Sequence, residues 1–192
     1  RIVHLEGGYH GETLGALSVT DVPAFREAYG AILRRNLVTP FPSRHAGNKQ
    51  FQCEACAVEA AGALAKLLAE KSGEIAAIIV EPMVQGASGM RMYHPLYLRR
   101  ARELATEHEV LLIADEIMTG FGRTGTFFAC EQAGIAPDLL CLSKGITGGY
   151  LPLSCVLSTD DVYGAFYDDS ASRAFLHSHS YTGNALACRA AL

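Results

Sequence analysis

The chain has 192 residues, of which 49% are hydrophobic and 19% charged, and its formal net charge is −4. This composition supplies enough apolar material for the core of one large domain or of a piece of a longer protein. The negative charge and the lack of a basic block argue against a nucleic-acid surface, and no apolar run is long enough to cross a bilayer. We therefore expect a soluble globular protein with neither a nucleic-acid nor a membrane partner.

Short apolar runs alternate with helical patterns along the chain, which is typical of an α/β protein whose mostly parallel sheet is flanked by helices. The clearest helical pattern places Val58, Leu64 and Leu68 on one apolar face. No repeat or linker interrupts the series, so a single domain is expected. The predicted elements, in chain order, are a strand over 2–5, a loose helical stretch over 23–33, an extended piece over 37–42, a helix over 53–71, a strand over 75–80, a flexible loop over 85–89, a helix over 95–108, strands over 110–114, 139–142 and 153–157, and helices over 160–166 and 185–192.

Two of the predicted strands lead directly into reactive side chains. The strand over 110–114 is followed by Asp115, and the strand over 139–142 is followed by Ser143 and Lys144. Ligands bind beyond the carboxyl ends of parallel strands, so we expect Asp115 and Lys144 to face the same crevice. A lysine that forms a Schiff base with an aldehyde, and an acid that keeps a pyridine nitrogen protonated, are what a pyridoxal phosphate enzyme needs.

Lys144 also has an ordinary explanation, since most lysines lie on the surface. Four apolar residues precede it and glycines follow it, which predicts a partly buried stem and an amine free to attack a carbonyl carbon. The residues alone leave a Schiff-base enzyme and a generic α/β domain as alternatives.

Two glycine-rich segments could contact a ligand. Glycines surround Tyr9 in the segment 6–13, so its ring either stands beside a ligand or merely covers the core. Residues 120–125 match the GxGxxG pattern of dinucleotide sites, but residues 115–119 separate the motif from the preceding strand. The fingerprint needs its glycines in the turn directly after the strand, so the nicotinamide interpretation is weak.

The cysteines and histidines give little support for a metal. Cys53 and Cys56 have CxxC spacing, but no second CxxC or HxxxH pair follows them. We expect free cysteines that pack as small apolar side chains in a reducing cytoplasm, and no metal site. His177 and His179 lack a third ligand nearby, and the hydroxyl groups around them better suit a phosphate at the N-terminus of the last helix.

Taken together, the motifs resemble those of the class III (ω-amino group) aminotransferases, which are pyridoxal phosphate enzymes of fold type I. The resemblance covers essentially the whole chain and rests on residues 8–11, 79–82, 112–117, 120–125 and 143–149. It implies that residues 1–192 are the central part of the cofactor-binding large domain. Because the chain starts within a strand and stops within a helix, an N-terminal segment and a C-terminal small domain are expected outside it.

The resemblance implies roles for four residues around the cofactor. Lys144 forms the Schiff base with pyridoxal 5′-phosphate and later carries the proton. Asp115 pairs with the pyridinium nitrogen. Tyr9 stacks on one face of the ring, and Ile117 lies against the other.

Further roles follow from the same resemblance. His179 and Ser180 match a pair that binds the phosphate from the partner subunit of a homodimer, although the family usually has threonine at position 180. Tyr9, Lys144 and three more residues are expected to contact the substrate, and these are Ser178, Glu12 and Arg123.

Within the family, residues 89–95 and 128–131 are most similar to the branch that aminates 8-amino-7-oxononanoate in biotin biosynthesis. Many relatives that use 2-oxoglutarate carry a glutamate where this chain has Ala87, which agrees with the biotin branch. The implied function is transamination of this ketone to 7,8-diaminononanoate by a cytoplasmic homodimer, with a small-molecule amino donor that is S-adenosylmethionine or lysine. The alternatives are another ω-amine or ω-amino acid:pyruvate transaminase, and an inactive fragment that acts as a scaffold.

Overall fold

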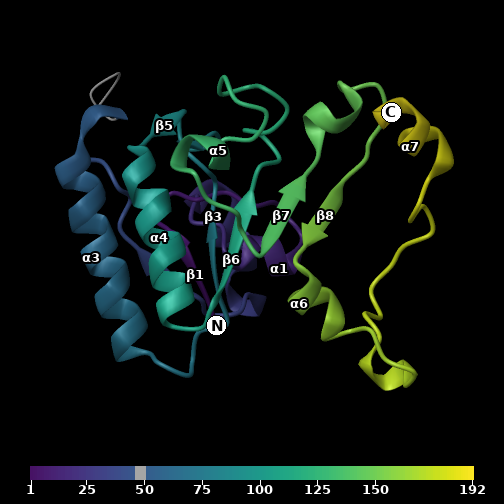
Figure 1. Cartoon of the computed structure of the whole chain (residues 1–192), viewed down its shortest axis with the longest axis horizontal. Helices are drawn as coiled ribbons and strands as arrows, with labels where there is room; N and C mark the ends of the chain where they lie inside the picture. The colour runs from purple at the N-terminus through teal and green to yellow at the C-terminus, as the bar shows by residue number, and fades with distance from the viewer. Residues whose placement is uncertain (46–50) are drawn as a thin grey trace.

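A six-stranded sheet runs through the molecule (Figure 1). The structure is a computed structural model that describes residues 1–45 and 51–192. The strand order is β2-β1-β3-β6-β7-β8, and every neighbouring pair is parallel except β7 and β8, which are antiparallel. The prediction of an α/β protein with a mostly parallel sheet is confirmed. The strands of this sheet are β1 (Ile2–Leu5), β2 (Leu37–Thr39), β3 (Ala77–Val80), β6 (Leu111–Asp115), β7 (Leu139–Leu142) and β8 (Cys155–Ser158).

One face of the sheet forms the main hydrophobic core. Val3 pairs with Ile78, and Ile78 pairs with Leu112, so a row of apolar side chains crosses three strands on the same face. All three residues are fully buried. Burial of this row fixes the register, because a slip of one residue would turn the whole row to the opposite face.

Two long helices cover this face (Figure 1). They are α3 (Glu54–Glu70) and α4 (Pro95–Glu107), and both agree with the predicted ranges to within one residue at each end. The predicted apolar face of α3 is wrong at Val58, which is 58% exposed, whereas Ala57 in the preceding position is fully buried. α3 packs on α4 through a row that includes several alanines, and their small side chains let the two helices approach closely.

Several short elements connect the larger ones. The stretch predicted as loosely helical contains α2 (Pro23–Arg26) and the 3-10 helix η1 (Glu27–Ile32), and α1 (Leu14–Leu17) precedes them. The predicted loop over 85–89 is the connection of a short hairpin, because β4 (Val84–Gln85) and β5 (Arg91–Met92) pair as antiparallel strands on either side of it. The GxGxxG segment lies in turns, and the next helix, α5 (Cys130–Ala133), begins only five residues after the motif. This arrangement differs from that of a dinucleotide fingerprint.

The C-terminal part extends away from the sheet (Figure 1). It contains α6 (Asp160–Gly164), the 3-10 helix η4 (Ala171–Arg173) and α7 (Ala185–Ala191). Large apolar side chains are exposed in this part, by 74% to 83% at Tyr167, Leu176, Tyr181 and Leu186. Among the helices that the structure describes, none has the length and the apolar composition that crossing a bilayer requires.

The expectation of free, buried cysteines is wrong at Cys53 and Cys56. A disulfide joins them at the start of α3, with 5.3 Å between their Cα atoms, and both are partly exposed. The CxxC spacing brings the two sulfur atoms together because the second cysteine lies in the first turn of the helix. Cys130 fits the expectation, since it is free and buried in the core.

Candidate active site

A pocket of about 460 Å³ opens at the carboxyl ends of the parallel strands. Four residues predicted to surround a cofactor line it: Tyr9, Asp115, Ile117 and Lys144. They come from the segments that follow β1, β6 and β7, which end at the same edge of the sheet. The parallel topology therefore brings together residues that are more than a hundred positions apart in the sequence.

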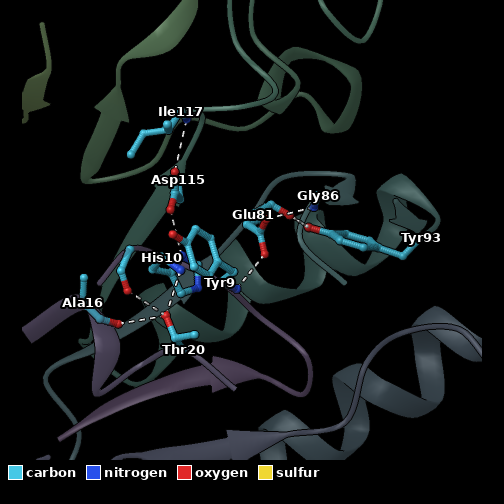
Figure 2. A network of polar contacts seen from close by, with 10 residues as sticks. Tyr9, His10, Ala16, Thr20, Glu81, Gly86, Tyr93, Asp115 and Ile117 are labelled. Atoms are coloured by element: carbon cyan, nitrogen blue, oxygen red, sulfur yellow. Dashed lines mark hydrogen bonds and ion pairs between the residues drawn. The ribbon is translucent and has the colours of Figure 1, made fainter. Parts of the chain in front are cut away.

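Asp115 is held firmly on the floor of the pocket. It is the last residue of β6 and is 6% exposed. Its Oδ1 atom accepts a hydrogen bond from the Ile117 backbone N–H at 3.1 Å, and its Oδ2 atom lies 2.8 Å from the Nδ1 atom of His10 (Figure 2). A carboxylate has about four acceptor positions, so two such contacts leave Asp115 able to accept another hydrogen bond from the pocket.

His10 links the loop after β1 to the end of β6. Its backbone N–H donates to the Thr20 hydroxyl oxygen at 3.0 Å, and the Thr20 hydroxyl lies within hydrogen-bonding distance of the Ala16 and Gly11 carbonyl oxygens (Figure 2). The side chain of His10 is almost completely buried beside Asp115. These contacts fix the imidazole, which in turn fixes the orientation of the carboxylate.

Glu81, at the end of β3, anchors two loops of the pocket. Its carboxylate accepts hydrogen bonds from the backbone N–H groups of Tyr9 at 3.0 Å and Gly86 at 3.1 Å (Figure 2). The Tyr93 hydroxyl donates to the Glu81 carbonyl oxygen at 2.8 Å. Burial raises the pKa of the Glu81 carboxyl above its ordinary value, although both N–H donors act in the opposite direction.

The Tyr9 ring stands at one wall of the pocket. Its ring centroid lies 5.0 Å from that of Phe25, and its hydroxyl donates to Glu12 at 2.9 Å. Partial burial and the Glu12 carboxylate raise the pKa of the Tyr9 phenol. Phe25 and Glu12 thus hold the ring in place at the wall of the pocket.

Lys144 differs from the expectation of a partly buried stem, because the structure leaves it exposed at the mouth of the pocket. It is the first residue of the 3-10 helix η3 (Lys144–Thr147), and its φ of 43° lies in the left-handed region. The following residue has to be small, since a Cβ atom on Gly145 would lie 2.8 Å from the Phe121 ring. Of the apolar residues before Lys144, Leu142 is buried and the other three in β7 are half-buried, while Lys144 itself is exposed.

The other predicted site residues lie outside the lining of this pocket. Glu12 touches it only through Tyr9, and Arg123 is exposed in a turn. Ser178, His179 and Ser180 lie exposed in the extended segment before α7. Their roles stay predictions.

The sequence reasoning missed His10, although it used the glycine-rich motif that contains this residue. A histidine between glycines, close to a predicted strand end, offered a signal. Its partner could not be identified, because Asp115 lies 105 residues later in the chain. Glu81 directly follows the predicted strand over 75–80, but its partners Tyr9 and Gly86 lie in two separate loops.

The aminotransferase class-III family matches the chain over residues 1–192. This chain belongs to the class III aminotransferases. Two similar proteins are curated as adenosylmethionine-8-amino-7-oxononanoate aminotransferases. That of Helicobacter pylori is 50% identical over 188 residues, which cover 97% of this chain and 41% of the relative. That of Synechococcus elongatus is 45% identical over 192 residues, which cover 100% of this chain and 44% of the relative.

Solved structures of aminotransferases have the same fold. The adenosylmethionine-8-amino-7-oxononanoate aminotransferase of Methanocaldococcus jannaschii superposes with a TM-score of 0.87 at 34% identity, covering 100% of this chain and 42% of the other. An amine transaminase from an uncultivated Pseudomonas species, in its PLP-bound internal aldimine form, superposes with a TM-score of 0.90 at 35% identity. The match covers 100% of this chain and 44% of the transaminase. The chain therefore spans less than half the length of the relatives that it matches.

Proposed function

We propose that the protein containing this chain is a pyridoxal phosphate-dependent aminotransferase that converts 8-amino-7-oxononanoate to 7,8-diaminononanoate. One observation carries the proposal: a fixed carboxylate, Asp115, and an accessible amine, Lys144, line the same pocket from two neighbouring parallel strands. The family match and the curated names of the relatives support the reaction.

The residues present fit pyridoxal phosphate. Asp115 keeps acceptor capacity toward the pocket, as a protonated pyridine nitrogen requires, and Tyr9 and Ile117 offer flat and apolar surfaces along the walls. When bound, the cofactor supplies an aldehyde that takes up an amine and a ring that accepts electrons. His10 orients Asp115, and the negative charge of Asp115 favours the protonated ring nitrogen.

Lys144 is the residue that we assign to attachment and proton transfer. Its Nζ atom would hold the cofactor, be displaced by the incoming amine and then move a proton within the pocket. Among the described residues, none makes a hydrogen bond or an ion pair with this amine. The side chain is consequently free to swing.

Ala87 supports the choice of substrate branch. It lines the pocket in the loop between β4 and β5, where many relatives that use 2-oxoglutarate carry a glutamate. A second candidate is a different ω-amine transaminase, which the likeness to an amine transaminase structure favours.

We also propose a homodimer in which each subunit completes the site of the other. Ser178, His179 and Ser180 are exposed and outside the pocket of their own chain, and exposed apolar side chains surround them in the C-terminal part. Residues 1–192 would then be the central part of the large domain. The cytoplasm is proposed as the compartment, on the strength of the biosynthetic reaction.

The experiment is a coupled assay of the full-length protein. We expect diaminononanoate from 8-amino-7-oxononanoate with S-adenosylmethionine or lysine as the donor, and little turnover with an aromatic amine and pyruvate. The opposite preference would favour the second candidate. A protein that gives no visible absorbance band with pyridoxal phosphate and no reductive trapping on Lys144 would be a scaffold without activity. Light scattering tests the dimer.

A further inference from the structure

A cluster of metal-ligating side chains lies away from the active-site pocket, at the start of α3. It consists of His45, Cys53 and Cys56, and one ligand atom from each lies within 4.8 Å of the other two. None of the three lines the pocket that contains Asp115 and Lys144. The cluster joins the segment that follows β2 to the helix that covers the sheet.

The donor set favours zinc. Two sulfur atoms and one imidazole nitrogen are soft or intermediate ligands, which bind Zn²⁺ far better than Mg²⁺ or Ca²⁺. Tetrahedral zinc has bonds of about 2.1 to 2.3 Å, so its ligand atoms lie about 3.4 to 3.8 Å apart. Once the Cys53–Cys56 disulfide is reduced, three atoms that already lie within 4.8 Å of one another have only a short distance to move to reach that geometry.

The backbone around the cluster stabilises a thiolate. The Cys56 N–H donates to the Cys53 sulfur at 3.2 Å, and Cys53 is the N-cap of the 17-residue helix α3. A hydrogen bond from an amide and the positive end of a helix both favour a negatively charged sulfur. The His45 backbone is also held in place, because its N–H donates to the Ser43 hydroxyl oxygen at 3.3 Å.

The cluster borders an open hollow beside Cys56. Cys56 lines an open hollow of about 90 Å³ together with Phe41 and Glu59. This volume is large enough for a water molecule, which would complete four ligands around the metal.

We propose that His45, Cys53 and Cys56 form a zinc site when the Cys53–Cys56 disulfide is reduced. Two molecules of a small thiol reduce the disulfide and leave as one oxidised disulfide, which gives two protein thiols. Zinc then displaces the two thiol protons to solvent, and the two thiolates balance its charge while His45 binds as the neutral imidazole. Oxidation by a small disulfide reverses both steps and releases the metal.

A zinc ion bound by His45, Cys53 and Cys56 would link the segment 40–45 to the start of α3. Phe41 in this segment packs against Tyr93 with 5.9 Å between ring centroids, and the Arg91 guanidinium lies 3.8 Å above its ring. Both partners belong to the region of β5, beside the loop that reaches the active site. Zinc at the cluster should therefore stabilise this edge of the fold.

The test uses the full-length protein, reduced with a non-chelating phosphine, freed of metal and titrated with Co²⁺ in place of zinc. We expect one metal per chain and a near-ultraviolet sulfur-to-cobalt absorption band. Cys53→Ser and Cys56→Ser should lose most of this band. His45→Ala should weaken binding by about 100-fold or more, since even outer-shell partners contribute about 10- to 100-fold. The matched controls Cys188→Ser and His108→Ala should bind as the wild type does, because both residues lie elsewhere in the fold.

A second measurement does not depend on variants that fold. Zinc should slow the alkylation of Cys53 and Cys56 in the wild-type protein, as mapped by mass spectrometry, while Cys188 reacts at an unchanged rate. The proposal is overturned if the reduced protein binds no stoichiometric metal, if alkylation of the pair is unaffected, or if His45→Ala binds as tightly as the wild type.

Discussion

The two sides of the active-site pocket are built in opposite ways. On one side, Asp115 is buried, and both of its oxygen atoms are engaged by His10 and Ile117. On the other, Lys144 is exposed at the end of β7, and no described residue holds its amine. Both residues follow short strands of one parallel sheet, so the difference arises after the strands end.

The contrast matches the chemistry that we propose for each residue. A group that stabilises charge at a fixed atom works best when it is oriented in advance, because no reorganisation is then needed during the reaction. A group that attaches, leaves and carries a proton has to move. Rigidity on the acid side and freedom on the lysine side are therefore both useful, and each can be tested.

The largest expected effect comes from removing the mobile amine. Lys144→Ala should lower kcat by about 10⁴-fold or more and abolish reductive trapping of the cofactor, since no other group can replace both functions. Lys144→Arg keeps the charge but cannot attach the cofactor, and should be equally inactive. Lys66→Ala on the surface of α3 is the control and should leave the assay unchanged. Substantial turnover by either Lys144 variant would remove it from the mechanism.

Loss of the fixed charge should have the next largest effect. Asp115→Asn keeps an acceptor for the Ile117 N–H and should fold, but it no longer favours a protonated ring nitrogen. We expect kcat to fall by about 10²- to 10⁴-fold. A cofactor analogue with a methylated, permanently charged ring nitrogen should restore part of the rate. An unimpaired variant, or the absence of rescue with bound analogue, would contradict the assigned role.

Substitution of His10 tests whether Asp115 needs its imidazole partner. His10→Ala removes the partner of Asp115 and should lower kcat by about 10- to 100-fold with little change in KM, because a misplaced carboxylate affects the reaction more than binding. His10→Asn offers an amide donor near the position of Nδ1 and should recover most of the loss. Equal defects in both variants, or a defect confined to KM, would indicate that His10 only stabilises the fold.

Gly145 tests the lysine side without altering the amine. In Gly145→Ala, the new Cβ atom would meet Phe121 at 2.8 Å, so either η3 or the turn at Phe121 has to shift. We expect about a tenfold fall in kcat and a loss of about 1 to 3 kcal/mol in the free energy of unfolding. Gly62→Ala, where nothing lies within 4 Å, is the control and should not lose stability. Full activity in Gly145→Ala would mean that the position of η3 is not important.

The smallest effect on turnover is expected at His4, in the strand beneath the acid side. Burial lowers the pKa of His4 from 6.5 to about 4. The unfolded chain therefore binds more protons than the folded one between these values, and stability falls as the pH drops through this window, by at most about 3 kcal/mol. His4→Gln should flatten this dependence in urea unfolding between pH 6.5 and 4 and leave activity at pH 7 unchanged. The control His108→Gln should retain the slope.

Local patterns in the sequence were sufficient for the larger elements. Apolar runs of four to six residues predicted the strands, and α3 and α4 were found to within a residue because their periodic patterns are long. The short hairpin β4–β5 and the short helices α1 and α5 were missed, since elements of two to four residues are stabilised by their surroundings more than by their own sequence.

By itself, the sequence determined the fold class and the family, and it placed Asp115 and Lys144 at strand ends, because these properties depend on periodicity and on contiguous motifs. Only the tertiary structure decided that His10 fixes Asp115, that Lys144 is exposed, and that His45 meets the Cys53–Cys56 pair. Each of these depends on where the chain turns after a regular element ends. Turns bring together residues that are distant in sequence, and hydrophobic periodicity carries no information about such pairs.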